Sequence, residues 1–233
     1  MNIIITGASQ GIGREIVKEF AKDKSNKIIG IARNKERLAS LEDEFSTIMF
    51  KGIVFDLSTI FNNGNNLLSE ITNYFPKVDI LINNAGSLYR KPFEETTSDE
   101  INQTFTTNVF VPAELIRLLL PFMSKESRSH IVNISSMAGF QGSVKFAGLA
   151  WYSASKAAIA CLTECLANEF KDRNIAVNSL ALGAVQTEML AQAFPGYTAQ
   201  IQPQQMAEFI TNFASTAHKV MNGAIIPVTL SNP

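Results

Sequence analysis

The chain has little of several features that mark specialised classes of protein. Its 233 residues include two cysteines and two histidines, and the histidines lie far from each other and from any carboxylate cluster with ligand spacing, so no metal site is predicted. Lysine and arginine total 20 against 21 aspartates and glutamates, a net charge of -1, which gives no electrostatic case for nucleic-acid binding. The longest apolar runs, such as 118–120, are far shorter than a membrane span, so no membrane association is predicted.

The N-terminus also lacks the pattern of a secretion signal. Residues Ile3 to Ile5 already have the pattern of a strand, and a glycine-rich turn begins at Gly7, which leaves no room for a signal peptide. The expected location is therefore the cytoplasm. Cys161 and Cys165 stand four apart in one helical pattern. We predict two small apolar side chains on a buried helix face, with a metal or redox pair as the alternative.

The remaining composition, 46% hydrophobic and 18% charged, is that of an ordinary soluble globular protein. Short apolar runs alternate with amphipathic stretches along the chain, which predicts a parallel sheet with helices on both faces. No linker, repeat or low-complexity tract interrupts this pattern, so we expect one α/β domain over 1–233, doubly wound and Rossmann-type, with seven strands. The predicted strands are 2–6, 27–32, 49–55, 78–83, 130–135, 175–181 and 224–228, and the predicted helices are 11–24, 35–46, 66–75, 99–123, 152–171 and 203–214.

A glycine-rich turn lies between the first predicted strand and the first predicted helix. In a doubly wound fold this turn binds a dinucleotide, because the strand end and the helix N-terminus present free N–H groups to a pyrophosphate. Glycine is needed where the backbone bends sharply and approaches the phosphates without a Cβ. A purely structural turn is the alternative. The residues expected to bind the cofactor are Gly7, Ser9, Gln10, Gly11, Ile12 and Gly13.

The residues after the second strand bear on which dinucleotide binds. An acidic residue there would bind the ribose hydroxyls of NAD, but Ala32 occupies that place and Arg33 follows. A guanidinium suits a 2′-phosphate, so NADP(H) is favoured over NAD(H), with a merely solvated Arg33 as the alternative. Asp56 and Leu57 follow the third strand and are expected near the adenine, although Asp56 equally fits a helix cap near Ser58.

Tyr152 and Lys156 stand four apart in a predicted helix and so share a face. An ammonium beside a phenol favours the phenolate, which would bring the tyrosine pKa from about 10 toward neutral. Such a tyrosine suits proton transfer in carbonyl and alcohol chemistry. Taken alone, the pair is more often a ring at the edge of the core beside a solvated charge.

Four further motifs precede this pair in order along the chain. They are Thr6-Gly7 through Gly13, Asn83-Asn84-Ala85-Gly86, Asn108, and Ile134-Ser135-Ser136-Met137-Ala138-Gly139. With them the chain resembles the short-chain dehydrogenase/reductase family, in its single-domain branch. The resemblance places Asn84, Ala85 and Gly86 on the adenosine side of the cofactor cleft.

The resemblance also implies four catalytic residues. Tyr152 would be the general acid or base, and Ser136 would bind the substrate oxygen; the Ser-x-x-Gly spacing to Gly139 selects it over Ser135. Lys156 would bind the nicotinamide ribose and bias Tyr152 toward phenolate. Asn108 would hold a water that links Lys156 to solvent.

The segment after the sixth strand departs from the family pattern. Leu182 stands where relatives have proline, and this loss is expected to loosen the turn. Val185 and Thr187 match residues that hold the nicotinamide carboxamide. A substrate lid is expected within 184–214. Aromatic residues expected to line a pocket, or else to belong to the core, are Tyr89, Phe140, Phe146, Trp151, Phe194 and Tyr197.

These residues predict an NAD(P)-dependent oxidoreductase that reduces a ketone or aldehyde with NADPH, its partner being a small carbonyl or alcohol substrate. Relatives pair through the helices at 99–123 and 152–171, which implies a homodimer or homotetramer. An NAD-dependent alcohol dehydrogenase is one alternative, which Arg33 disfavours. A non-catalytic nucleotide-binding or regulatory protein is another, to which Leu182 and the altered C-terminus point.

Overall fold

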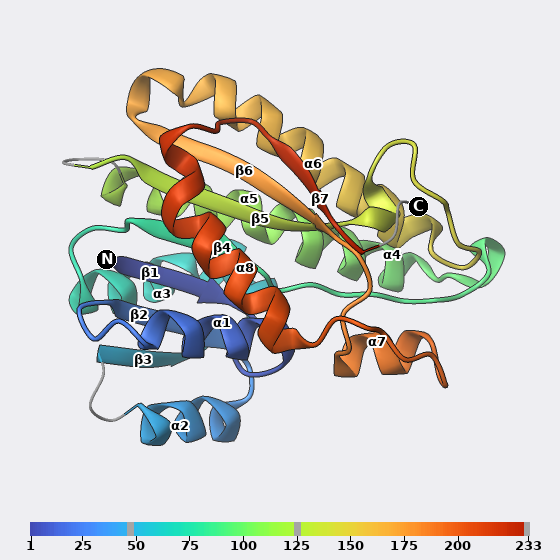
Figure 1. Ribbon diagram of the computed structural model, residues 1–233, viewed down its shortest axis with the longest axis horizontal. Coiled ribbons are helices and arrows are strands. Elements are labelled where there is room, and N and C mark those ends of the chain that lie inside the picture. Colours follow the sequence, from blue (N-terminus) through green and yellow to red (C-terminus); the bar gives the residue numbers. More distant parts are fainter. Residues whose placement is uncertain (46–48, 124–126, 231–233) are drawn as a thin grey trace.

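The computed structural model describes residues 1–45, 49–123 and 127–230. Within them, seven parallel strands form one sheet in the order β3-β2-β1-β4-β5-β6-β7 (Figure 1). The strands are β1 (Asn2–Thr6), β2 (Lys27–Ala32), β3 (Met49–Val54), β4 (Ile80–Asn83), β5 (Ser129–Ser136), β6 (Ile175–Leu182) and β7 (Ile225–Val228). Each overlaps a predicted strand, so the predicted doubly wound α/β fold is confirmed.

The central strands are buried on both faces, which explains their nearly unbroken apolar sequence. Ile3, Ile4 and Ile5 of β1 have no exposed surface. Successive side chains point to opposite faces of a strand. Accordingly, Ile3 and Ile5 belong to one core cluster and Ile4 belongs to the other. The sheet therefore separates two apolar cores.

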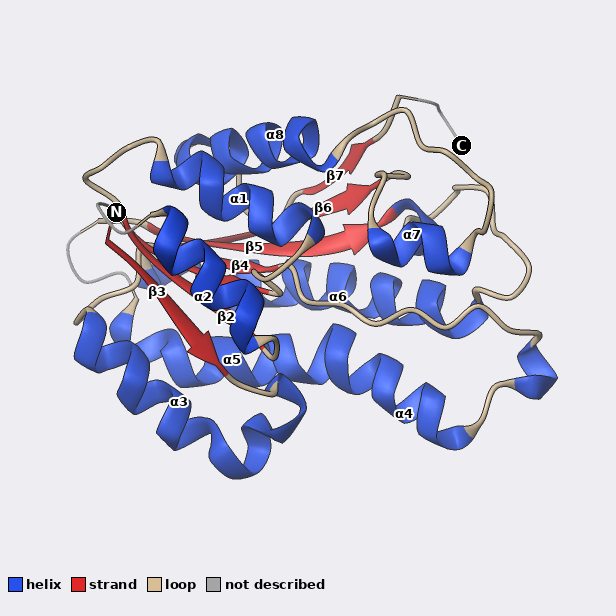
Figure 2. Ribbon diagram, turned by 90° about the horizontal axis from the view of Figure 1, so that it is seen from below, coloured by secondary structure: helices blue, strands red, loops and turns tan. Residues whose placement is uncertain are grey.

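Helices cover both faces of the sheet (Figure 2). One face carries α1 (Gly11–Ala21), α2 (Lys35–Glu44) and α8 (Pro203–Thr216), and the other carries α3 (Ile60–Tyr74), α5 (Val111–Leu119) and α6 (Ala150–Glu169). The first layer packs through side chains such as Ile16 and Ile210. The second packs through side chains such as Leu67, Leu115 and Ala167.

A helical stretch of 25 residues, Ser98–Phe122, runs along the second face. It joins α4 (Ser98–Phe105), a π-helical turn (Thr106–Phe110), α5 and a 3-10 turn (Leu120–Phe122). An 18-residue window within it has a mean hydropathy of 1.2, so the stretch is long and apolar enough to cross a membrane, although length and composition alone are weak evidence. Val111, Leu115 and Leu119 are buried in the core, as in an amphipathic helix covering a sheet.

The strand order reverses between β1 and β4, which are neighbours in the sheet although β2 and β3 lie between them in sequence. Chain connections leave β1 and β4 in opposite directions at this point, so a crevice opens beyond their carboxyl ends. The glycine turn after β1 and the Asn84 segment after β4 border this crevice. The fold thus brings the two motifs together.

Several predicted element boundaries differ from those of the structure, and the start of α3 differs most. Helix α3 begins at Ile60 rather than residue 66, because its asparagine-rich first turns are poor helix formers that tertiary packing overrides. A Cβ on Gly64 would come within 2.7 Å of Leu118, so the glycine permits close approach of α3 to α5. The predicted helix 35–46 ends at Glu44, and its last predicted residue lies outside the described ranges.

The cysteine prediction was also wrong. Cys161 and Cys165 are both exposed. The buried face of α6 is formed instead by Ile159, Thr163 and Ala167. Cys161 and Cys165 lie together on the opposite, outer face, because residues four apart lie on the same side of a helix.

The region 184–214, expected to be a lid, consists of two parts, and the second part belongs to the core. Its first half contains a short helix that was not predicted, α7 (Glu188–Ala193). Its second half is α8, whose Met206, Ile210 and Phe213 are buried in the core against α1. Cavity-lining residues of this region end at Tyr197.

Candidate active site

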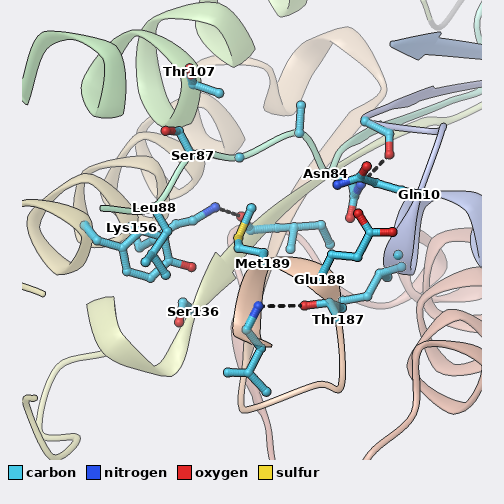
Figure 3. Close-up of a pocket in the computed structure, with 18 of the residues that line it drawn as sticks. Gln10, Asn84, Ser87, Leu88, Thr107, Ser136, Lys156, Thr187, Glu188 and Met189 are labelled. Atoms are coloured by element: carbon cyan, nitrogen blue, oxygen red, sulfur yellow. Dashed lines mark hydrogen bonds between the residues drawn. The ribbon is translucent and has the colours of Figure 1, made fainter. Parts of the chain in front are cut away.

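A cavity of about 1410 Å³ runs along the carboxyl ends of the strands. It brings together all the predicted site residues except Gly13 and Asn108. Figure 3 shows Ser136 and Lys156 toward one side of the view and Gln10, Asn84, Thr187 and Glu188 toward the other. The predicted residues that line it are Gly7, Ser9, Gln10, Gly11, Ile12, Arg33, Asp56, Leu57, Asn84, Ala85, Gly86, Ser136, Tyr152, Lys156, Val185 and Thr187.

The glycine turn has the geometry of an anion site. Gly7 and Gly11 have positive φ angles of 67° and 53°, which L side chains rarely adopt. Helix α1 begins at Gly11, and its N-cap residue Gln10 makes no side-chain capping bond, with no acidic residue in the first turn. The first N–H groups and the positive end of the helix dipole therefore face the cavity without a side-chain acceptor. These residues fit a dinucleotide pyrophosphate.

Gly13 contributes packing rather than a cavity wall. A Cβ at this position would lie 2.2 Å from the Gly7 carbonyl oxygen and 2.6 Å from Asn84 Nδ2. Gly13 is buried and absent from the cavity lining. The prediction of direct cofactor contact by Gly13 is therefore replaced by a role in seating α1 against the turn.

Polar bonds hold the Asn84 segment against the glycine turn. Thr6 Oγ1 accepts from the backbone N–H groups of Asn84 and Ala85, each at 3.0 Å. Asn84 Nδ2 donates to the Thr6 carbonyl oxygen at 3.0 Å. One threonine and one asparagine thus fix the two sides of the crevice relative to each other.

The nucleotide end of the cavity is lined by Ala32 and Arg33 after β2. Arg33 is exposed. Asp56 also lines this end, and its carboxylate accepts from Ser58 N at 3.0 Å and Ser58 Oγ at 2.8 Å. The capping role of Asp56 is therefore confirmed, and its contact with the adenine stays a prediction that its place in the cavity wall allows. Leu57 follows it in that wall.

Ser136, Tyr152 and Lys156 meet at the opposite end. Ser136 ends β5 and lines the cavity with Tyr152, close enough for its hydroxyl to lower the pKa of the phenol. Lys156 Nζ donates to the Ile134 carbonyl oxygen at 2.8 Å and lies 5.8 Å from the centre of the Tyr152 ring. Ser135 Oγ instead donates to the Lys156 carbonyl oxygen at 2.6 Å. The serine selected from the sequence is the one beside the phenol.

The expected shift of the Tyr152 pKa was wrong in direction. Burial raises the pKa of Tyr152, and the smaller effect of the Ser136 hydrogen bond lowers it. Burial also lowers the pKa of Lys156 to about 8. Desolvation of the phenol therefore outweighs attraction by the ammonium.

The side chain of Asn108 forms hydrogen bonds between separate segments, and its role in holding a water beside Lys156 stays a prediction. Its side chain is buried, and Oδ1 accepts from Ser87 N at 2.8 Å. Nδ2 donates to the Ser87 carbonyl oxygen and to Ser155 Oγ, both at 2.9 Å. Ser155 Oγ in turn donates to the Tyr152 carbonyl oxygen at 2.7 Å. The side chain ties the cavity wall at Ser87 to α6 rather than projecting into the cavity.

The turn after β6 is not loose, contrary to the expectation for Leu182. Leu182 is buried as the last residue of β6, paired with Ser136 and Val228. Gly183 N then donates to the Val228 carbonyl oxygen at 2.9 Å. Pairing on both sides replaces the conformational restraint that proline would supply.

The next two predicted residues are held as well. Val185 forms a bridge with Ile201. Thr187 Oγ1 accepts from Leu190 N at 3.2 Å and caps α7. Its methyl group would lie 3.6 Å from a Cβ on Gly11. The start of α7 is therefore seated over the phosphate turn.

The predicted aromatic wall is divided. Phe146, Phe194 and Tyr197 line the cavity. Trp151 instead stacks on Phe93, with ring centres 5.2 Å apart. Tyr89 bonds through its hydroxyl to Gln103, and neither it nor Phe140 lines the cavity.

Two arginines near the site were not predicted from the sequence. Arg37 of α2 forms an ion pair with Glu188 of α7 at 3.2 Å and donates to Gln10 Oε1. Arg90, in the segment after β4, lines the cavity and donates to the Ala193 carbonyl oxygen at 3.1 Å. A capping threonine followed by an acidic residue, Thr187-Glu188, was a signal for α7. No local pattern reveals contacts between such distant segments.

Known proteins share these motifs and this fold. The family model described as short chain dehydrogenase matches residues 1–198. The chain belongs to the short-chain dehydrogenase/reductase family. This is a family of oxidoreductases that act on CH–OH or carbonyl groups, so the predicted family is confirmed.

Two curated relatives illustrate the similarity. L-xylulose reductase of Caenorhabditis elegans is 37% identical over 190 residues, which cover 80% of this chain and 72% of the relative. Dehydrogenase/reductase SDR family member 7B of Xenopus laevis is 34% identical over 202 residues, covering 83% of this chain. The matched part is 61% of that relative's length.

A solved structure shows the same architecture. The 3-ketoacyl-(acyl-carrier-protein) reductase from Brucella melitensis, complexed with NADH, has a TM-score of 0.88 and 25% sequence identity. The match covers 97% of this chain and 96% of that one. The likeness thus extends beyond residue 198, where the family match ends.

Proposed function

We propose that the protein reduces a ketone or aldehyde to an alcohol with NADPH, and that Tyr152 is the proton donor. One observation carries the proposal. Ser136, Tyr152 and Lys156 meet in the cavity that also contains the uncapped start of α1. A protein that only bound a nucleotide would have no need to bury an ammonium beside a phenol.

When bound, the dihydronicotinamide would supply a hydride to the carbonyl carbon. Tyr152 then gives its phenolic proton to the carbonyl oxygen, while the Ser136 hydroxyl donates a hydrogen bond to that oxygen. The raised pKa of Tyr152 favours this direction, because an acid must hold its proton before the reaction. Lys156 donates to Ile134, and its other N–H donors suit the ribose hydroxyls. Its positive charge stabilises the phenolate that remains.

The preference for NADP(H) rests on Arg33 and Ala32. The exposed guanidinium of Arg33 lines the nucleotide end of the cavity, and no acidic residue occupies the end of β2. The similar reductase from Brucella melitensis was solved with NADH, so this preference needs its own test. Arg33→Ala should weaken NADPH binding about tenfold or more and leave NADH binding unchanged. Equal affinities for NADPH before and after the change would support the NAD-dependent alternative.

Tyr152→Phe tests the reaction itself. Loss of the proton donor should lower kcat/KM by about 100- to 10,000-fold while the dissociation constant of NADPH stays the same. Tyr74→Phe, far from the cavity lining, is the matched control. Full turnover by Tyr152→Phe would exclude the mechanism. Cofactor binding by the wild type without turnover of any carbonyl compound would support a regulatory role instead.

We also propose a homodimer or homotetramer formed through α4, α5 and α6. An exposed apolar side chain supports this, since Phe110 is 50% exposed on the π-helical turn between α4 and α5. Light scattering should give a mass of two or four chains, and Phe110→Asp should lower it. A cytoplasmic location, without membrane or nucleic-acid partners, stays a prediction that fractionation of cells would test.

A further inference from the structure

Arg90 stands beside the catalytic end of the cavity. Lys91 N donates to the Gly148 carbonyl oxygen at 3.1 Å, and a Cβ on Gly148 would lie 3.2 Å from Arg90 Cγ. Gly148 precedes Tyr152 by four positions, just before α6 begins. The stem of Arg90 therefore packs next to the start of the helix that carries Tyr152.

The Arg90 guanidinium contacts a carbonyl oxygen and an aromatic ring, which are both neutral. Nη1 donates to the Ala193 carbonyl oxygen at 3.1 Å, and the guanidinium carbon lies 4.4 Å from the centre of the Phe194 ring. A guanidinium has five N–H donors in a planar fork. The carbonyl and the ring hold the group in place from α7 without neutralising its charge.

The acidic residues of the cavity lie elsewhere. Among the described lining residues they are Glu36, Asp56 and Glu188. Glu36 and Asp56 lie at the nucleotide end, and Glu188 pairs with Arg37. The neighbouring cation, Lys91, is already paired with Glu100 at 2.5 Å.

The wall around Arg90 mixes apolar and polar groups. Its apolar members are Leu88, Phe146, Leu149, Met189, Phe194 and Tyr197, and its polar members include Ser87 and Gln103. Arg90 is exposed, so an anion can reach its guanidinium from solvent, and the strength of the contact depends on the two parallel hydrogen bonds that the fork can form. The substrate end thus combines apolar surface with the positive charge of Arg90, in addition to that of Lys156.

We propose that Arg90 binds a carboxylate or phosphate group on the carbonyl substrate. The inference rests on the proposed reductase function and adds a substrate class to it. The guanidinium fork matches either anion with two parallel hydrogen bonds. The carbonyl would face Ser136 and Tyr152, and the substrate carbons would lie along the apolar wall. The substrate class is therefore the oxo acids or the phosphorylated ketoses.

Matched substrate pairs test this inference and separate the two anions. One pair is an aliphatic oxo acid and its methyl ester, and the other is a ketose phosphate and the free ketose. Each is assayed with wild type, Arg90→Met, Arg90→Lys and Lys145→Met. Lys145 is the control, because its Nζ bonds to Phe140 O and Ser143 Oγ, and it does not line the cavity.

Arg90→Met should lower kcat/KM for the preferred anionic substrate about 10- to 100-fold and change the neutral partner little. Arg90→Lys should restore part of this loss, and Lys145→Met should behave as wild type. Equal losses for the charged and neutral members of both pairs would show that Arg90 only clamps α7, and would overturn the inference. Unchanged rates in Arg90→Met would overturn it too.

A binding measurement tests anion recognition by Arg90 without requiring turnover, and so is independent of the proposed reductase activity. Glutarate and glycerol 3-phosphate are titrated into the protein saturated with NADP+, and heat is recorded. Binding by wild type that Arg90→Met weakens at least tenfold supports the inference, even if no carbonyl compound is reduced. Absence of binding to wild type, or equal binding to both proteins, contradicts it while leaving a reductase of neutral substrates possible.

Discussion

Arg37 and Glu188, 151 positions apart in the chain, form an ion pair at 3.2 Å that joins α2 to the first turn of α7. Arg37 Nη1 also donates to Gln10 Oε1 in the phosphate turn. Thr187, next in sequence, lies over Gly11. These contacts form a clasp between α2, the phosphate turn and α7 beside the nucleotide end of the cavity.

Glu188→Gln should therefore speed the release of NADPH. Both side chains are substantially exposed, at 39% and 55%, so the pair is worth only about 0.2–1 kcal/mol. We expect the dissociation rate, measured by stopped-flow fluorescence, to rise by up to about fivefold. The difference from wild type should shrink at high salt, because salt screens exposed charges.

Glu44→Gln is the matched control for this change. Glu44 also pairs with basic side chains, Arg14 and Lys18, but it does not line the cavity. Its replacement should leave the release rate unaltered. Release from Glu188→Gln at the wild-type rate, at low salt, would show that the clasp does not retain the cofactor.

Lys156→Met should abolish activity but stabilise the fold. Burial lowers the pKa of Lys156 to about 8, which means that its charged form costs folding free energy at pH 7. Methionine removes that charge and keeps a similar shape. Removal of the buried charge outweighs the loss of the hydrogen bond to Ile134, so the free energy of unfolding should rise by about 1–3 kcal/mol at pH 7.

The pH dependence checks this explanation. The folded pKa of Lys156 lies below the ordinary lysine value of 10.5, so the unfolded chain binds more protons between pH 8 and 10.5. The cost of the buried charge fades as pH rises through that window. The advantage of Lys156→Met over wild type, measured by urea unfolding, should fade with it. A variant less stable than wild type at pH 7 would contradict the argument.

His130 should make the fold sensitive to acid. Its ring has no exposed surface, and burial lowers its pKa to about 4. Nδ1 bonds the Ala214 carbonyl oxygen at 2.8 Å and so carries the proton. Nε2 then accepts from Asn178 Nδ2 at 2.9 Å and has no room for a second proton. Arg128 and His218 also disfavour a positive charge there.

Because the folded pKa of His130 is depressed, its contribution to stability is present above pH 6.5 and lost as pH falls toward 4. The loss should amount to about 2–3 kcal/mol. His130→Gln should be less stable than wild type at pH 7 and should lose less stability on acidification. Unfolding at acid pH can be followed by circular dichroism. Equal losses of stability in the two proteins between pH 6.5 and 4 would exclude His130 as the cause of the acid sensitivity.

The fold was predictable because its determinants are local. Runs such as Ile3–Ile5 identify buried strands by composition alone, and Gly7 to Gly13 mark the turn that follows. The cysteines were predictable in principle, since Ile159, Thr163 and Ala167 define a buried helix face that excludes Cys161 and Cys165. Their predicted burial was wrong because it depended on the apolar character of cysteine and not on its position around the helix.

The candidate site was less predictable because its details depend on tertiary contacts. Whether burial or a nearby ammonium controls the pKa of Tyr152 is a balance of desolvation and distance, which the sequence does not contain. The bonds of Asn108 to Ser87 and Ser155 likewise join separate segments. The clasp between Arg37 and Glu188 required α7, a six-residue helix too short to show a periodic pattern.

Two identical side chains stand next to each other at the end of β5. Ser135 holds α6 through the Lys156 carbonyl oxygen, and Ser136 lines the cavity beside the phenol of Tyr152. A shift of β5 by one residue against β4 and β6 would exchange the two without altering any amino acid. Which hydroxyl performs chemistry is therefore decided by strand alignment, so a mutation far along β5 that favours slippage would inactivate the protein with every catalytic residue intact.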